Sequence, residues 1–126
     1  GKVILVPFDS SCIGIYDPIA NSYNDGPEHG KPGFAFAGGV LASNGKVILV
    51  PFNSDSIGIY DPIDNSYNDE PIHVKGNPGY PFAGGVLAPN GKVILVPFNS
   101  DNVGIYGGDY PLKNENDVLS PYFNKF

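Results

Sequence analysis

The most apolar stretch of the chain is a run of four aliphatic residues that occurs three times. Val-Ile-Leu-Val stands at residues 3–6, 47–50 and 93–96, each time after Gly-Lys and before Pro-Phe. An apolar run without a polar interruption is typical of a β-strand that is buried on both faces. The pattern therefore predicts a central strand at each of these three places.

Each central strand belongs to a longer unit with four predicted strands. In the most complete unit a small, Gly-containing segment at 34–42 comes first, and Asn-Gly, the strongest short hairpin signal, joins it to the central strand at 46–52. A polar break follows, and then an apolar strand at 57–60 that ends at Asp-Pro, because proline cannot donate to a central ladder. A short polar strand at 65–69 closes the unit. We call the four strands A, B, C and D in this order.

The units are copies of one another. The segment Gly-Lys-Val-Ile-Leu-Val-Pro-Phe begins at residues 1, 45 and 91, so the starts are 44 and 46 residues apart. Residues 1–25 and 45–69 are identical at 21 of 25 positions, which indicates equivalent structures. A period of about 40–50 residues is that of one four-stranded propeller blade. We therefore predict an all-β fold made of β-propeller blades, each with four antiparallel strands.

The repeats predict one propeller-type domain that holds about three blades. Closed propellers have about four to eight blades, and the chain contains no Met. We therefore expect a partial propeller that is completed by a longer chain or by copies of this chain, with strand B of the first blade paired on both sides in the native assembly. The predicted boundaries within residues 1–126 are 1–32 for strands B–C–D of the first blade, 33–78 for the second blade, 79–106 for strands A–B–C of the third, and 107–126 for a C-terminal cap.

A double glycine lies in strand A of two units, at residues 38–39 and 84–85. We expect strand A to be the innermost strand of each blade, where neighbouring blades crowd together. A Cβ atom would clash at such a position, and glycine has none.

Two short motifs follow each other in the first two units. Tyr16-Asp17-Pro18 precedes Asn21-Ser22-Tyr23, and Tyr60-Asp61-Pro62 precedes Asn65-Ser66-Tyr67. This order resembles a divergent kelch-type blade, in which a Tyr-Asp-Pro element precedes Asn-x-Trp. Here Tyr replaces Trp, and the double glycine lies in strand A rather than at the end of strand B. The resemblance covers residues 1–106 and implies a propeller fold, but a shared fold implies no particular activity or partner.

Composition narrows the classes of partner. Seven Lys, no Arg and thirteen acidic residues give a net charge of −6. This balance argues against a nucleic acid or an anionic membrane as the partner, because phosphate contacts need clustered cations. No apolar run reaches the ~18 residues that a membrane helix needs. The single Cys excludes an internal disulfide framework and a multi-thiolate metal site.

The candidate chemistry has structural alternatives that we favour. His29 and His73 occupy matching places in the loops from strand D to strand A, and could be ligand contacts or a metal pair; we favour partly exposed loop histidines. The Asn-Ser-Asp type turns after strand B could offer oxygen ligands to Ca²⁺, but these residues are also preferred in turns for their own backbone bonds. Asp17 and Asp61 suit Asx-type turns, and Phe8, Phe52 and Phe98 suit core or inter-blade packing. We predict no catalytic residue, no metal and no cofactor.

Two function classes remain open. Near-identical units favour a non-catalytic structural or interaction module, because catalysis needs unlike groups in fixed roles. The alternative is a propeller enzyme of hydrolase or oxidase type, with its site at the central channel or the loop face. The expected partner of a module is a protein, a second copy or the rest of a longer chain, with carbohydrate also possible; the compartment stays open. The candidate partner-facing residues lie in loops that share one face: Asp9, Ser10, Ser11, His29, Asn53, Ser54, Asp55, His73, Asn99, Ser100 and Asp101.

Overall fold

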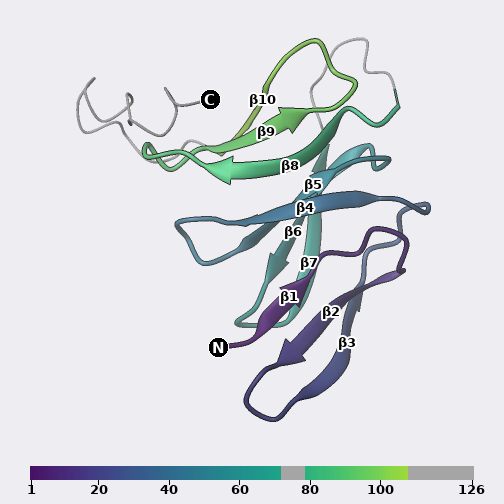
Figure 1. Ribbon diagram of the computed structural model, residues 1–126, viewed down its shortest axis with the longest axis vertical. Helices are drawn as coiled ribbons and strands as arrows, with labels where there is room; N and C mark the ends of the chain where they lie inside the picture. Colours follow the sequence, from purple (N-terminus) through teal and green to yellow (C-terminus); the bar gives the residue numbers. More distant parts are fainter. Residues whose placement is uncertain (72–78, 108–126) are drawn as a thin grey trace.

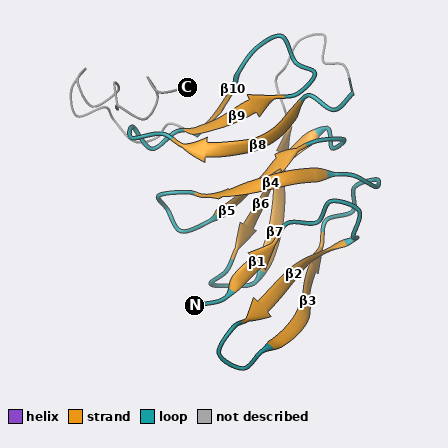
Figure 2. Cartoon of the chain, in the orientation of Figure 1, coloured by secondary structure: helices purple, strands orange, loops and turns teal. Residues whose placement is uncertain are grey.

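β-Strands and turns make up the part of the chain that the computed structural model describes, residues 1–71 and 79–107, and no helix occurs there (Figure 2). Consequently no helix in these residues could span a bilayer. The strands are β1 (Val3–Leu5), β2 (Cys12–Asp17), β3 (Ser22–Glu28), β4 (Phe36–Leu41), β5 (Val47–Pro51), β6 (Ser56–Asp61), β7 (Ser66–Pro71), β8 (Phe82–Leu87), β9 (Val93–Pro97) and β10 (Gly104–Tyr106).

These strands form three antiparallel sheets, which follow one another along the molecule in Figure 1. The first sheet has the order β1-β2-β3, the second β4-β5-β6-β7 and the third β8-β9-β10. Strands A, B, C and D were thus predicted correctly in type and order. In the described residues the first sheet holds B, C and D, and the third holds A, B and C. Apart from Gly107, the predicted C-terminal cap lies outside the described residues.

The Asn-Gly sequences form the hairpin turns that the sequence predicts. Gly45 and Gly91 both have φ of +86°, a conformation that glycine adopts without steric cost. The side chain of Asn44 accepts a hydrogen bond from the Lys46 N–H at 3.0 Å, and Asn90 does the same for Lys92. These turns fix how strand A pairs with strand B.

The Tyr-Asp-Pro and Asn-x-Tyr motifs form the turn from strand C to strand D. The Asp17 carboxylate accepts hydrogen bonds from the backbone N–H groups of Ala20 and Ile19, and these bonds lower the pKa of Asp17. The Tyr16 hydroxyl donates to the side chain of Asn21 at 2.7 Å, while Asn21 adopts a positive φ of 51°. Asp61 accepts an equivalent bond from Ile63, so the predicted Asx-type turns are confirmed.

The core lies between the sheets, in two clusters. The first inter-blade core joins the first and second sheets and contains Ile13, Ala35, Phe36, Leu49 and Tyr60. The second inter-blade core joins the second and third sheets and contains Val40, Ile48, Val50, Ile57, Phe82, Val93 and Leu95. Each sheet therefore gains its apolar burial by packing face to face with a neighbour.

The double glycines lie where strands A of the second and third sheets, β4 and β8, contact each other. A Cβ atom on Gly38 would stand 3.0 Å from the Cα atom of Gly84 in the neighbouring sheet. Gly38 and Gly84 also have φ of +82° and +79°, and the register between strands A and B shifts at both places. This confirms that strand A is the strand at which neighbouring blades crowd.

Candidate functional site

The loops from strand B to C and from D to A meet at one end of the sheets. The Ala35 N–H donates to the Phe8 carbonyl at 2.9 Å, and the Phe52 N–H donates to the Ala35 carbonyl at 2.8 Å. The Asn53 N–H donates to the Phe34 carbonyl at 3.0 Å. We call the surface formed by residues 7–11, 29–35, 52–55, 79–81 and 98–103 the loop face. The sequence predicted that these loops share a face, and these bonds confirm it.

The predicted partner-facing residues divide into exposed and buried groups. His29 and Ser54 are buried, Ser100 is half-buried, and His73 lies outside the described residues. The others are exposed on the loop face: Asp9, Ser10, Ser11, Asn53, Asp55, Asn99 and Asp101. His29 and Ser54 therefore cannot meet a partner without a change of the fold.

Several of these polar side chains hold the loops together. The Ser54 hydroxyl donates to the Ser56 carbonyl at 2.7 Å and accepts from the Ser56 N–H at 3.0 Å. The hydroxyls of Ser10 and Ser100 make the same pair of bonds, each with the backbone carbonyl and N–H of the residue two positions later in the chain. The Asn53 amide donates to the Gly33 carbonyl at 3.0 Å, and Asn99 donates to the Gly79 carbonyl at 3.1 Å. Their side chains thus already have structural roles in the loop face.

His29 is fully engaged inside the fold. Its Nε2 donates to the Ser10 carbonyl at 2.8 Å, because its Nδ1 accepts from the Lys31 N–H at 3.0 Å and is therefore the unprotonated nitrogen. The ring also packs edge-on against Phe36, with centroids 5.4 Å apart. The expectation of a partly exposed loop histidine is corrected: the ring fills the corner between the first two sheets, and both nitrogens are used.

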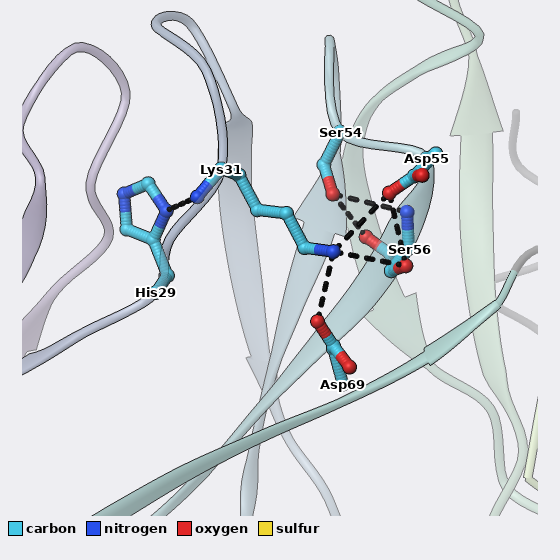
Figure 3. A network of polar contacts seen from close by, with 6 residues as sticks. All are labelled: His29, Lys31, Ser54, Asp55, Ser56 and Asp69. Carbon is cyan, nitrogen blue, oxygen red and sulfur yellow. Dashed lines mark hydrogen bonds and ion pairs between the residues drawn. The ribbon is translucent and has the colours of Figure 1, made fainter.

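An ion-pair cluster around Lys31 lies at the loop face (Figure 3). The Lys31 Nζ lies 2.9 Å from Asp69 Oδ2 on β7 and 3.2 Å from Asp55 Oδ1, and it also donates to the Ser56 hydroxyl at 3.3 Å. The bonds to Asp69 and Asp55 raise the pKa of Lys31, and Lys31 in turn lowers the pKa of Asp55. The cluster ties the loop before β4 to the far strands of its own blade.

Removing this lysine is expected to change the titration of Asp55. In Lys31→Met the pKa of Asp55 rises toward its ordinary value of 3.8, because its strongest hydrogen-bond donor is gone. Because the pKa of Asp55 is lower in the folded chain than in the unfolded chain, its ionised carboxylate stabilises the fold at pH values above the unfolded pKa. This stabilisation is lost as the pH falls through the folded pKa. NMR titration of the carboxyl carbon measures the change. Lys46→Met, at the hairpin turn after strand A, is the matched control; equal titration of Asp55 in wild type and Lys31→Met would contradict the ion pair.

A row of aromatic rings crosses the loop face from blade to blade. Phe8, Phe52 and Phe98 follow strand B in the three sheets; the centroid of Phe52 lies 5.5 Å from that of Phe8 and 5.3 Å from that of Phe98. Phe34 packs at a tilt against Phe8, with ring centroids 5.0 Å apart, and Tyr80 packs in the same way against Phe52 at 4.8 Å. Phe52 is half-buried and the other four are exposed, Phe98 by 64%. We call these five rings the aromatic strip.

Two members of the strip adopt an unusual backbone conformation. Phe34 has φ of 58° and Tyr80 has φ of 60°, in the left-handed region that bulky residues rarely occupy. Backbone strain of this kind persists only where the surroundings over-determine it, and it gathers at functional sites. Here Asn53 and Asn99 fix the glycine carbonyl that precedes each ring.

The aromatic strip differs from what the sequence indicated. Phe8, Phe52 and Phe98 were expected in the core or between blades; they do contact one another between blades, but Phe8 and Phe98 are exposed. Phe34 and Tyr80 were not singled out at all. The available signal was the repeated Pro-Gly-aromatic sequence at 32–34 and 78–80, which places a ring directly after a turn.

The described residues show little that resembles a chemical centre. No three His, Cys, Asp or Glu side chains within 1–71 and 79–107 lie close enough together to hold a metal ion. Cys12 is half-buried, with its Sγ 3.8 Å from the Ser10 hydroxyl. The hydroxyl of Tyr67 is buried without a hydrogen-bond partner in this part of the chain, and this burial raises the pKa of Tyr67.

Comparison with known proteins gives a structural match only. No family model matches the sequence, and no curated protein matches it. Among solved structures, virginiamycin B lyase from Staphylococcus aureus superposes with a TM-score of 0.66 at 12% identity, over 88% of this chain and 39% of that one. A streptogramin B lyase structure superposes with a TM-score of 0.63 at 18% identity, over 94% of this chain and 39% of that one. The chain thus spans about two fifths of the length of these proteins, and the likeness shows its fold: it is built of β-propeller blades.

Proposed function

We propose that the chain is a non-catalytic interaction module, in which propeller blades present the loop face to a partner. The proposed partner is a polypeptide, either another protein or a second copy, and carbohydrate is the further class that aromatic rings suit. The module holds its ligand by contact with repeated side chains from neighbouring blades.

The aromatic strip carries this proposal. Large exposed apolar patches are uncommon on soluble proteins and mark interaction sites. Aromatic side chains dominate the binding energy of protein interfaces because they bury a large area with few rotatable bonds. Phe34 and Tyr80 reach the strip only through a strained backbone, which supports a role beyond folding.

The polar residues around the strip suggest what the partner carries. Asp9, Asp55 and Asp101 are exposed on the loop face, and the whole chain has a net charge of −6. An apolar centre with a polar rim is the usual anatomy of a protein interface. A partner segment with an apolar or aromatic anchor and flanking Lys or Arg residues would match both parts, since opposite charges steer association.

The second candidate is an enzyme, and the names of the structural neighbours favour it. Both neighbours are lyases by name, one acting on virginiamycin B and one on streptogramin B. Against this candidate, the loops of the three sheets carry nearly the same residues, whereas catalysis needs unlike groups in fixed roles. The kelch-like assignment and the division into blades at residues 32, 78 and 106 remain proposals beside the propeller fold.

Loss of two exposed rings is expected to weaken partner binding without unfolding the chain. A random-peptide phage library is panned on the immobilised chain, and the selected peptides are then measured on Phe8→Ser/Phe98→Ser. We expect binding to weaken at least about tenfold, because two interface rings are removed. Thermal unfolding of both proteins checks that the variant is folded.

The matched control is Ile19→Ser/Ile63→Ser. These side chains are 90% and 94% exposed in the turns from strand C to strand D, at the opposite end of the sheets. The control substitutions therefore remove exposed apolar surface at a distance from the aromatic strip. Peptides that bind the strip variant and wild type equally would contradict the proposal. Consumption of virginiamycin B by the purified chain, followed by mass spectrometry, would favour the enzyme instead.

A further inference from the structure

Equivalent residues of the repeats line the two contacts between neighbouring sheets, but the empty groove at the first contact is larger than the groove at the second. Ile4, Ile15 and Val47 line the contact between the first and second sheets; the equivalent residues Ile48, Ile59 and Val93 line the contact between the second and third. The first contact encloses a groove of about 680 Å³, and the second one of about 260 Å³. The larger groove is within the size range of ligand-binding pockets, about 300–1,000 Å³. None of its lining residues belongs to the loop face.

The groove runs along the open edge of β1. In the second sheet β5 is hydrogen-bonded to β4 on one side and β6 on the other, whereas in the described residues β1 is bonded to β2 only. Ile48 and Val50 on β5 are buried, Ile48 to 2% exposure; the identical residues Ile4 and Val6 are only half-buried. The sequence is the same, so the difference comes from the strand that covers β5 and not β1.

The floor of the groove shows which side chain is missing. A Cβ atom on Gly85 in the third sheet would meet Val40 of β4 at 3.0 Å and Val50 of β5 at 3.2 Å. The equivalent Gly39 meets Val6 at 2.9 Å, but no residue stands in the place of Val40. A valine on an added strand would fill that place beside Val6.

On the opposite face of the first sheet, a tyrosine of the same sheet takes the place that a phenylalanine of strand A takes in the other two sheets. The ring of Phe36 on β4 covers Gly58, with its Cζ 3.0 Å from where a Cβ would be, and Phe82 covers Gly104 in the same way. In the first sheet the ring of Tyr23 covers the equivalent Gly14, with its Cε1 at 2.9 Å. Tyr67, the equivalent of Tyr23, instead packs beside Phe36 with centroids 6.3 Å apart. Tyr23 thus occupies the position that a phenylalanine from strand A takes elsewhere.

We propose that the edge of β1 and the groove beside it are a binding site for one further β-strand with the side-chain pattern of β4, Phe-Ala-Gly-Gly-Val-Leu. The strand binds antiparallel to β1 by main-chain hydrogen bonds, the mode known as strand addition. Its register follows that of β4 on β5, where Val40 pairs with Ile48 and Phe36 with Pro51. The valine of the added strand therefore lies opposite Ile4, and its phenylalanine displaces the ring of Tyr23 from Gly14.

A synthetic peptide tests this site on the intact chain. The probe has the sequence of residues 33–44 with a lysine tail for solubility, and hydrogen exchange is followed by NMR. At a peptide concentration about ten times the dissociation constant, the β1 amides that do not bond to β2 are expected to exchange about tenfold more slowly. The ring signals of Tyr23 are expected to shift, because the ring leaves Gly14.

Two altered peptides distinguish strand addition from adhesion. A peptide with aspartate in place of Val40 is expected to bind more weakly, because the carboxylate would move out of water to a place beside the apolar side chain of Val6. A peptide with alanine in place of Phe36 is expected to bind more weakly and to leave the Tyr23 signals unchanged. Equal binding of all three peptides, or no change at β1, overturns the proposal. A chain that is already dimeric, with protected β1 amides and no response to the peptide, also overturns it and assigns the groove to a second copy.

Discussion

Replacing Leu49 with alanine is expected to lower the free energy of unfolding by about 2–5 kcal/mol, the range for a fully buried leucine. Leu49 is 0% exposed and lies in the first inter-blade core, between Phe36 and Tyr60. The substitution removes apolar contacts and leaves a cavity that the two packed sheets cannot close. Urea denaturation followed by circular dichroism measures the loss.

Leu5→Ala is the matched control, because Leu5 has the same neighbours in sequence and the same position on strand B. Its side chain is 44% exposed, since no sheet covers that face of β1 in the described residues. We expect a loss of about 1 kcal/mol, in proportion to the smaller area removed from water. Equal losses for Leu5 and Leu49 would show that the face of the first sheet is covered in solution.

Gly38→Ala is expected to destabilise the chain by about 2–5 kcal/mol. The φ of +82° costs an L-residue about 1–2 kcal/mol, and the new methyl group would stand 3.0 Å from the Cα of Gly84. That neighbour is backbone on another sheet, so the sheets must separate, and overpacking of this kind costs about 1–3 kcal/mol more. The same denaturation experiment measures the effect.

Two glycines with the same backbone conformation separate the two costs. Gly45 and Gly84 have φ of +86° and +79°, but a Cβ on either would meet no atom within 4 Å. Gly45→Ala and Gly84→Ala are therefore expected to cost only the conformational part, about 1–2 kcal/mol. If all three variants lose the same stability, the close approach of Gly38 to Gly84 does not constrain the sheets.

The strands and turns could be predicted from the sequence because their signals are local. Asn44-Gly45 closes a hairpin, and Asp61 binds the backbone of its own turn, whatever the rest of the chain does. Because the units are nearly identical in sequence, a strand or turn that is clear in one unit also predicts the same element in the others.

Burial and exposure could not be predicted in the same way, because they depend on which sheet lies next to a residue. Leu5 and Leu49 are identical in sequence context, yet among the described strands only Leu49 has a neighbouring sheet on its face. His29 stands in a polar loop, but the ring of Phe36 and two backbone groups enclose it. The same applies to Phe98: its recurrence once per blade indicated packing in the core or between blades, but its ring is exposed in the aromatic strip.

The near-identity of the blades has a consequence for how the chain folds. β4 and β8 have the same sequence, so β5 could pair with either during folding, and such mispairing is a characteristic failure of repeat proteins. The correct partner is reached by closing a loop over residues 42–46, whereas β8 is reached only across residues 52–81. Since closure entropy grows with the logarithm of loop length, the short loop is favoured by roughly 1.5 kcal/mol, or about tenfold. The short Asn-Gly turns therefore favour pairing of β5 with β4 early in folding, before the identical strand β8 of the next blade can pair with β5.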